Sequence, residues 1–365
     1  MQDLVRACVA TIKPYEPGKP VEEVQRELGL TDVLKMASNE NPLGPSPRAL
    51  EALVTALPDL FYYPEGSCRR LRAAIAERLK ISPDNIVVGN GADELLKVIP
   101  LAFLREGEEV IIAEHSFTEY TLVTRLLGGQ PVYVPRRGLR QDLRRMAEAV
   151  TPRTKLVFVC NPCNPTGTMV SREEAEDFLA RVPERVIVIF DEAYREFASA
   201  SDFPDLLPHI RAGRKNLIIL RTFSKAYGLA GLRVGYGIAH PELIGWLNRV
   251  RDPFNVNTLA QVAATAALDD QEHVARSQQM VWEGREYLYR AFETLGLEYE
   301  PTQANFILVN VGKDCRRVFR ELLLEGVIVR PADIWDLPTY VRVTIGTAEQ
   351  NRRFVEALQR VLTRI

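Results

Sequence analysis

The sequence predicts an α/β fold: a mostly parallel, doubly wound, seven-stranded sheet in a large domain, followed by a smaller α+β domain. Between residues 68 and 240, short β-rich runs alternate with segments of helical periodicity. The run 186–190 is continuously apolar, which is typical of a strand buried on both faces of a parallel sheet. After about residue 255 a long helical stretch and shorter strands replace this alternation.

The large domain is predicted from its strands and the helices between them. Seven strands are expected at residues 86–88, 110–113, 131–134, 155–160, 186–190, 216–221 and 233–239. Leu71, Ile75 and Leu79 recur at the spacing of one helix face. Ser171 followed by Glu174 has the pattern of a capping box, which predicts the start of another helix.

The smaller domain is predicted from the C-terminal third of the chain. A helix is expected at 273–295, with strands at 306–309, 327–330 and 340–345. Thr347 is expected to cap the last helix. We therefore divide the chain into an N-terminal arm that includes part of the small domain (1–45), a large domain (46–255) and a small C-terminal domain (256–365).

Composition and charge narrow the class of protein. The 365 residues are 46% hydrophobic and 26% charged, with a formal net charge of -2, which argues against a nucleic-acid-binding surface. The densest basic cluster, 136–145, lacks interleaved aromatic residues, so we interpret it as a solvated turn and helix face. No apolar run approaches the length of a membrane span, and the start of the chain does not resemble a signal peptide.

The five cysteines are odd in number and scattered, which favours a reduced cytoplasm over a disulfide framework. Cys160 and Cys163 form a C-x-x-C pair. We interpret the pair as part of a tight turn and not as a metal or redox site, because no second pair exists and the four histidines lie far away in sequence.

Lys225 is the most informative residue of the chain. It follows a predicted strand and two hydroxyl residues, Thr222 and Ser224, and Arg233 comes eight positions later. A lysine amine can form the Schiff base of pyridoxal 5'-phosphate, while hydroxyl groups and a guanidinium can hold its phosphate. The segment therefore predicts a covalently held pyridoxal phosphate.

Two further segments fit the same cofactor. Asp191 follows the apolar run 186–190, and a buried aspartate needs a cationic partner such as the pyridinium nitrogen of the cofactor. An aspartate that caps a helix is the structural alternative. Tyr194 and Asn164 are candidates to bond the phenolic oxygen of the ring and so tune the pKa of the Schiff base.

The loop 89–94 leads from a predicted strand into an apolar helix and includes Ala92 and Asp93. Its glycines permit close backbone approach, and the helix start offers N–H groups to a phosphate. Taken alone, the loop fits a dinucleotide site or a tight turn equally well. Phe117, after the strand 110–113, is on its own more typical of a core aromatic residue than of a ring that stacks on a cofactor.

These segments, in this order, resemble fold-type-I pyridoxal-phosphate aminotransferases, and more narrowly the histidinol-phosphate aminotransferase family. The similarity runs through 37–47, 63–66, 161–167, 191–194, 222–233, 304–306, 329–331 and 341–347. The segment 39–47 and the segment around Arg342 are more specific to the histidinol-phosphate branch than the other segments are. The chain departs from the family's pattern at Cys163, where Asn is commoner, and at Tyr62, where a basic residue is usual.

The resemblance implies roles for several residues. Phe117 stacks on the cofactor, and Arg342 binds a substrate carboxylate as a bidentate fork. Arg330 is the candidate for a second anion, either the substrate phosphate or the distal carboxylate of glutamate. Tyr63 reaches the cofactor phosphate of the neighbouring subunit, which implies a homodimer. Substrate-binding roles are also expected for Asn41, Asn164 and Tyr15, the last in a segment that closes over the substrate.

The expected activity is transamination between L-histidinol phosphate and 2-oxoglutarate, in histidine biosynthesis, with Lys225 as the base that moves the substrate proton. An aromatic aminotransferase and a decarboxylase of a phosphorylated amino acid remain as alternatives. A nicotinamide-dependent oxidoreductase that uses the loop 89–94 is disfavoured, because the third glycine is missing and Lys225 would have no role. A non-catalytic binding module is disfavoured because both Lys225 and Asp191 are present.

Overall fold

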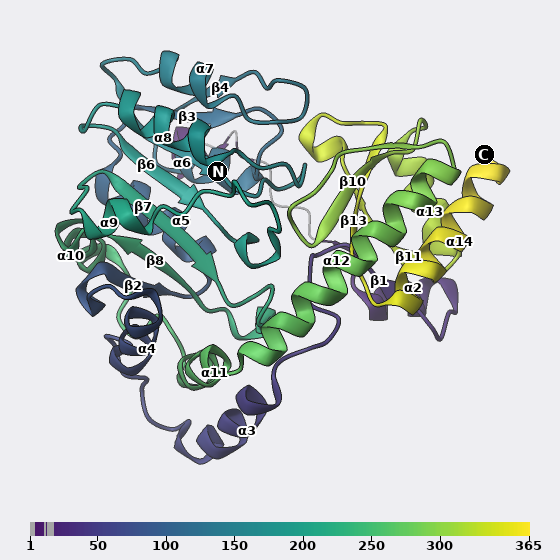
Figure 1. Ribbon diagram of the computed structural model, residues 1–365, viewed down its shortest axis with the longest axis horizontal. Coiled ribbons are helices and arrows are strands. Elements are labelled where there is room, and N and C mark those ends of the chain that lie inside the picture. Colours follow the sequence, from purple (N-terminus) through teal and green to yellow (C-terminus); the bar gives the residue numbers. More distant parts are fainter. Residues whose placement is uncertain (1–3, 11, 13–17) are drawn as a thin grey trace.

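The computed structural model describes residues 4–10, 12 and 18–365. Its centre is a seven-stranded sheet in the order β2-β8-β7-β6-β5-β3-β4 (Figure 1). The strands are β2 (Ile86–Gly89), β3 (Glu109–Ala113), β4 (Gln130–Val134), β5 (Thr154–Cys160), β6 (Ile187–Asp191), β7 (Leu217–Thr222) and β8 (Gly235–Ala239). β8 alone runs opposite to the other six strands of this sheet, so the predicted mostly parallel sheet is confirmed.

Helices cover both faces of this sheet, as a doubly wound fold requires. One apolar core joins one face of the sheet to α5 (Ala92–Phe103), α6 (Thr118–Leu126) and α10 (Pro241–Val250). The core on the other face includes α4 (Arg69–Leu79), α7 (Leu143–Glu148), α8 (Arg172–Arg181) and α9 (Leu207–Arg211). The predicted capping box of Ser171 and Glu174 is present at the start of α8.

The smaller domain lies beside the large one and is joined to it by the long helix α12 (Gln271–Thr294), as Figure 1 shows. Its four-stranded sheet has the order β12-β13-β10-β9. The strands are β9 (Glu298–Tyr299), β10 (Phe306–Asn310), β12 (Arg330–Pro331) and β13 (Tyr340–Thr344), and α13 (Cys315–Leu324) and α14 (Ala348–Arg364) pack nearby. Thr347 caps α14 as predicted.

The N-terminal segment contributes to the small domain. β1 (Leu34–Lys35) pairs in parallel with β11 (Val327–Ile328), and Val24 of α2 (Val21–Leu28) packs in the same small core as Ile328. The predicted continuous strand 327–330 is therefore wrong. The chain changes sheets there, because Ile328 pairs with β1 whereas Arg330 pairs with β13.

One other element boundary differs from the expectation. β8 begins at Gly235 and not at residue 233, because Arg233 adopts a left-handed conformation with φ +57°, which a strand does not accommodate. The helix α11 (Thr258–Asp269) packs on α3 (Pro47–Ala56) and α4. The division at residue 255 stays a prediction, and this packing favours a boundary along α12.

Within the described residues, no helix combines the length and the apolar character needed to cross a membrane.

Candidate active site

A cavity of about 280 Å³ lies where loops that follow the strands of the large sheet face the small domain. Parallel α/β sheets place ligands at this edge, because their helix N-termini and loops converge there. The cavity gathers twelve of the residues singled out from the sequence: Ala92, Asp93, Phe117, Asn164, Asp191, Tyr194, Thr222, Ser224, Lys225, Arg233, Arg330 and Arg342.

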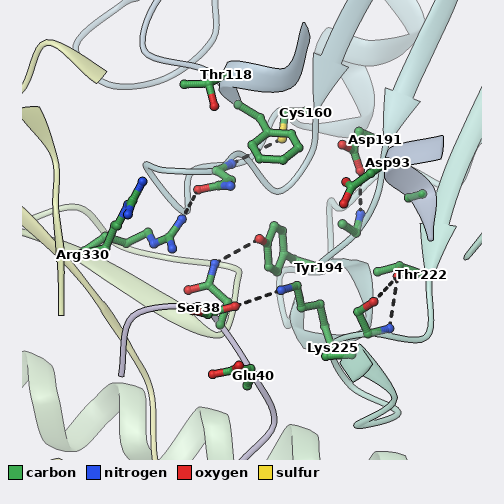
Figure 2. Close-up of a pocket in the computed structure, with 18 of the residues that line it drawn as sticks. Ser38, Glu40, Asp93, Thr118, Cys160, Asp191, Tyr194, Thr222, Lys225 and Arg330 are labelled. Atoms are coloured by element: carbon green, nitrogen blue, oxygen red, sulfur yellow. Dashed lines mark hydrogen bonds between the residues drawn. The ribbon is translucent and has the colours of Figure 1, made fainter. Parts of the chain in front are cut away.

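Lys225 lies in the loop that follows β7, and its side chain points into the cavity (Figure 2). Its Nζ donates to the carbonyl oxygen of Ser38 at 3.1 Å and lies 5.7 Å from the ring centroid of Tyr194. Burial, supported by the positive charge of Arg342, lowers the pKa of Lys225 to about 8. The amine therefore loses its proton far more readily than an exposed lysine, as a nucleophile or base must.

Asp191 is the last residue of β6 and is 5% exposed. Its Oδ2 accepts from the Tyr120 hydroxyl at 2.7 Å, and its Oδ1 accepts from Ala193 N at 3.2 Å. Burial raises the pKa of Asp191 to about 6 in spite of these hydrogen bonds. Among the described residues it has no ion pair, so the carboxylate is matched to a cation that the chain itself does not supply.

Polar groups suited to an anion surround the start of α5. Thr222 Oγ1 donates to Ser224 Oγ at 3.0 Å, and Arg233 Nη2 donates to Asp93 Oδ2 at 3.0 Å. Arg233 lies at the rim of the cavity, and 43% of its side chain is exposed. A Cβ on Gly91 would lie 2.6 Å from Arg233 Nη2, so only glycine permits this approach to the helix N-terminus.

Two arginines from the small domain form the opposite wall. Arg330 of β12 and Arg342 of β13 are direct partners in the antiparallel register, and both are buried. The guanidinium of Arg342 lies 5.1 Å from the ring centroid of Trp335 and 5.2 Å from that of Phe306. Such packing against aromatic faces fixes a planar guanidinium in place.

Asn164 and Tyr194 are held by bonds between segments far apart in the sequence. Arg342 Nη1 donates to Asn164 Oδ1, and Arg342 Nη2 donates to Ala37 O at 2.7 Å. Asn39 Nδ2 donates to the Tyr194 hydroxyl at 3.0 Å. The small domain and the N-terminal segment therefore position residues of the large domain.

Sequence reasoning missed several residues of this site. Ser38 and Asn39 line the cavity, whereas in this segment a role was expected only for Asn41. A left-handed Asn39, with φ +56°, is the kind of position that Asn tolerates best, but the sequence does not reveal φ. Trp335 also lines the cavity, and nothing in its local sequence indicated a role.

Two of the predicted residues, Asn41 and Tyr63, do not line the cavity. Asn41 Nδ2 donates to Ala226 O at 3.0 Å and to Ser277 Oγ at 2.8 Å, and its expected contact with the substrate stays a prediction. Tyr63 is 83% exposed and stacks on Phe254 with ring centroids 4.9 Å apart. Tyr15 lies outside the described residues.

Comparison with known proteins assigns the class of enzyme that this fold and site define. Residues 31–358 match the family described as aminotransferase class I and II, and the chain belongs to that family. The oxidoreductase and the non-catalytic module considered from the sequence are therefore wrong.

The relatives narrow the comparison further. The chain is 55% identical over 357 residues to the histidinol-phosphate aminotransferase of Moorella thermoacetica, covering 98% of this chain and 92% of the relative. It is 46% identical to that of Caldicellulosiruptor saccharolyticus, covering 98% and 100%. The crystal structure of the Sinorhizobium meliloti histidinol-phosphate aminotransferase in complex with pyridoxal-5'-phosphate superposes with a TM-score of 0.91 at 28% identity, covering 99% and 98%.

Proposed function

We propose that this aminotransferase uses pyridoxal 5'-phosphate to transfer the amino group of L-histidinol phosphate to 2-oxoglutarate. The products are imidazole acetol phosphate and L-glutamate, and the reaction belongs to histidine biosynthesis. The relatives named for this activity and the composition of the cavity support the proposal. The observation that carries it is the pair of buried, register-matched arginines, Arg330 and Arg342, opposite Lys225.

The residues present fit the cofactor. Asp191, buried with its pKa raised and with no cation beside it in the described chain, suits the protonated pyridine nitrogen. Thr222, Ser224, Arg233 and the N-terminus of α5 offer donors for its phosphate. When bound, pyridoxal phosphate supplies a carbonyl carbon that condenses with amines and a ring that accepts the electrons released at the substrate Cα.

In this proposal, side chains of the cavity transfer the proton and hold the cofactor ring. The lowered pKa of Lys225 suits its amine to act as the base that would take the proton from the substrate Cα and deliver it to the C4′ atom of the cofactor. Tyr194, Asn164 and Phe117 line the cavity; the first two would donate to the phenolic oxygen of the cofactor, and Phe117 would pack against its ring. The hydrogen bonds from Asn39 and Arg342 orient the first two side chains.

The two arginines account for the choice of substrate. A phosphate group carries close to two negative charges near neutral pH and accepts bidentate hydrogen bonds from guanidinium groups. Arg330 and Arg342 lie side by side on neighbouring strands and face the cavity, so they can share one phosphate. The α-carboxylate and the distal carboxylate of glutamate together carry the same charge as the phosphate. When glutamate occupies the cavity, these carboxylates can bind the same two arginines.

The active unit that we propose is a homodimer located in the cytoplasm. An apolar surface on α3 and the segment after it stays exposed in the single chain: Leu50, Val54, Leu57, Leu60, Phe61, Tyr62 and Tyr63. Burial of such a surface favours association, and it would carry Tyr63 to the cofactor phosphate of the partner. All five cysteines are free thiols, which fits a reducing compartment.

The visible absorption spectrum of the purified holoenzyme tests the proposal. Histidinol phosphate and phenylalanine are titrated into separate samples, and the loss of the cofactor band is followed. The proposal requires a response to histidinol phosphate at a concentration at least about tenfold lower. A stronger response to phenylalanine would assign an aromatic aminotransferase instead, and release of CO₂ without any need for an oxo acid would assign a decarboxylase.

A further inference from the structure

Two cysteines lie beside the active site without a role in the transamination. Cys160 ends β5 and borders the cavity, and Cys163 lies three residues further on in the loop that carries Asn164. Both are buried, with 2% and 0% exposure. Both sulfurs contact the backbone of Asn164: its N–H donates to Cys160 Sγ at 3.3 Å, and its carbonyl oxygen lies 3.5 Å from Cys163 Sγ.

Cys163 differs from Cys160 because its sulfur accepts a hydrogen bond from a buried arginine, Arg136. The basic cluster that contains Arg136 was expected to be solvated, and for this residue the expectation is wrong, because it is 9% exposed. Its guanidinium donates to Glu114 O, to Leu139 O at 2.7 Å, to His115 O at 3.0 Å and to Cys163 Sγ at 3.2 Å. The three carbonyl partners are neutral, and within the described chain Arg136 has no ion pair with a carboxylate.

A buried guanidinium stabilises an anion that it contacts directly, so a contacting group that can ionise is favoured in its charged form. Among the four atoms that Arg136 contacts, only the sulfur of Cys163 can ionise. Burial raises the pKa of Cys163, but the hydrogen bond with Cys160 and the charge of Arg136 together lower it well below the ordinary value. The same hydrogen bond raises the pKa of Cys160, which keeps its proton.

We propose that Cys160 and Cys163 form an oxidant-sensitive dithiol, in which Cys163 is the reactive thiolate and Cys160 the resolving thiol. Hydrogen peroxide is the oxidant. The thiolate sulfur attacks one peroxide oxygen, the O–O bond breaks, and hydroxide leaves with a proton as water, so that Cys163 becomes a sulfenic acid. The Cys160 sulfur then displaces the hydroxyl group as a second water, which leaves one disulfide, two oxidised sulfurs and two waters from one peroxide.

The disulfide would reach the active site through Asn164. The backbone N–H of Asn164 donates to Cys160 Sγ at 3.3 Å, and its side-chain oxygen accepts from Arg342. Joining the two sulfurs draws the loop toward β5 and removes the thiolate that Arg136 requires. Asn164 and Arg342 then lose their alignment, so oxidation stops turnover. This loss of activity rests on the proposed function, whereas formation of the disulfide does not.

The test treats the holoenzyme with hydrogen peroxide and follows activity and mass together. We expect a loss of about 2 Da in the peptide that contains both cysteines, in parallel with inactivation, and recovery of both with dithiothreitol. Cys163→Ser should retain its basal activity. Peroxide should inactivate this variant at least about tenfold more slowly than the unmodified enzyme. Cys8→Ser, which removes a more exposed thiol outside this loop, is the matched control and should behave as the unmodified protein.

Each outcome decides the proposal. Inactivation that proceeds equally fast in Cys163→Ser, or that disappears in Cys8→Ser, would overturn it. The absence of the disulfide in the intact enzyme would also overturn it. If the disulfide forms but histidinol phosphate is not a substrate, the dithiol stands and only the proposed function fails.

Discussion

At the scale of single residues, the site is built from groups held in unfavourable protonation states. The pKa of Asp191 is raised to about 6 and that of Lys225 is lowered to about 8, in both cases chiefly by burial. A difference of one in pKa corresponds to about 1.4 kcal/mol, so the protein without its cofactor is destabilised by a few kcal/mol at these positions. The burial that prepares Asp191 and Lys225 for the reaction therefore lowers the stability of the cofactor-free protein.

Asp191→Asn should therefore stabilise the cofactor-free protein while it lowers kcat at least about 100-fold, because an amide cannot balance a pyridinium charge. The folded pKa of Asp191 exceeds the ordinary value of 3.8, so its ionisation costs stability fully above about pH 6 and not below about pH 4. We expect a gain of about 1–3 kcal/mol at about pH 8 that shrinks toward zero at about pH 4. Urea unfolding at the two pH values measures it, and a gain independent of pH would contradict the argument.

Arg330 tests the proposed phosphate site. Arg330→Ala removes one of two neighbouring guanidinium groups, so kcat/KM for histidinol phosphate should fall about 100-fold, whereas that for phenylalanine should change less than about threefold. Arg330→Lys keeps the charge but loses the planar fork, and should lie between these limits. Steady-state kinetics with both donors provides the measurement. Equal losses for the two donors would remove Arg330 from phosphate recognition.

At the scale of elements, the sequence predicted those strands and helices whose formation depends on their own residues, and not those that depend on distant pairing. The strands of the large sheet were visible because continuous apolar runs result from burial on both faces, as in β6. The break between β11 and β12 was not visible, because it depends on pairing with Leu34 and Lys35, almost 300 residues away. Most cavity residues followed from strand ends and the family resemblance.

The missed and misjudged residues depend on tertiary contacts that no local pattern encodes. Arg136 lies among arginines that are typical of a solvated turn, and only the folded loop gives it three carbonyls and a sulfur. Asn41 belongs to a segment that resembles family sequences, but its amide is occupied by α12 and by the lysine loop. Likeness of sequence located the segment without resolving which of its side chains faces the cavity.

The turn before α5 offers a test with a matched control. Gly91 and Gly107 have nearly the same left-handed φ, +78° and +80°, but a Cβ would meet Arg233 only at Gly91. Alanine should cost about 1 kcal/mol of stability at Gly107 and about 1–3 kcal/mol at Gly91, whose ψ of 165° is almost restricted to glycine. Only Gly91→Ala should also displace Arg233 and raise the Kd of pyridoxal phosphate by at least about tenfold. A titration of cofactor absorbance measures both affinities, and equal Kd values would mean that Arg233 does not hold the phosphate.

At the scale of the whole molecule, the single chain leaves one part of the expected site outside the cavity. Phe61 and Tyr63 are 76% and 83% exposed, beside the exposed apolar side chains of α3. Tyr63 is not among the residues that line the cavity of its own chain. A symmetric dimer that buries this surface would present Tyr63 to the other subunit, since each patch in such an interface meets its own copy.

Mixing two impaired variants distinguishes a shared site from a self-contained one. Lys225→Ala lacks the reactive amine, and Tyr63→Ala lacks the proposed contact from the partner. If Tyr63 acts across the interface, unfolding and refolding a 1:1 mixture gives half heterodimers, each with one complete site, and so roughly a quarter of normal activity. If Tyr63 acts within its own chain, both sites of every heterodimer are defective. Activity then stays near the mean of the two variants, which would contradict the proposed dimer site.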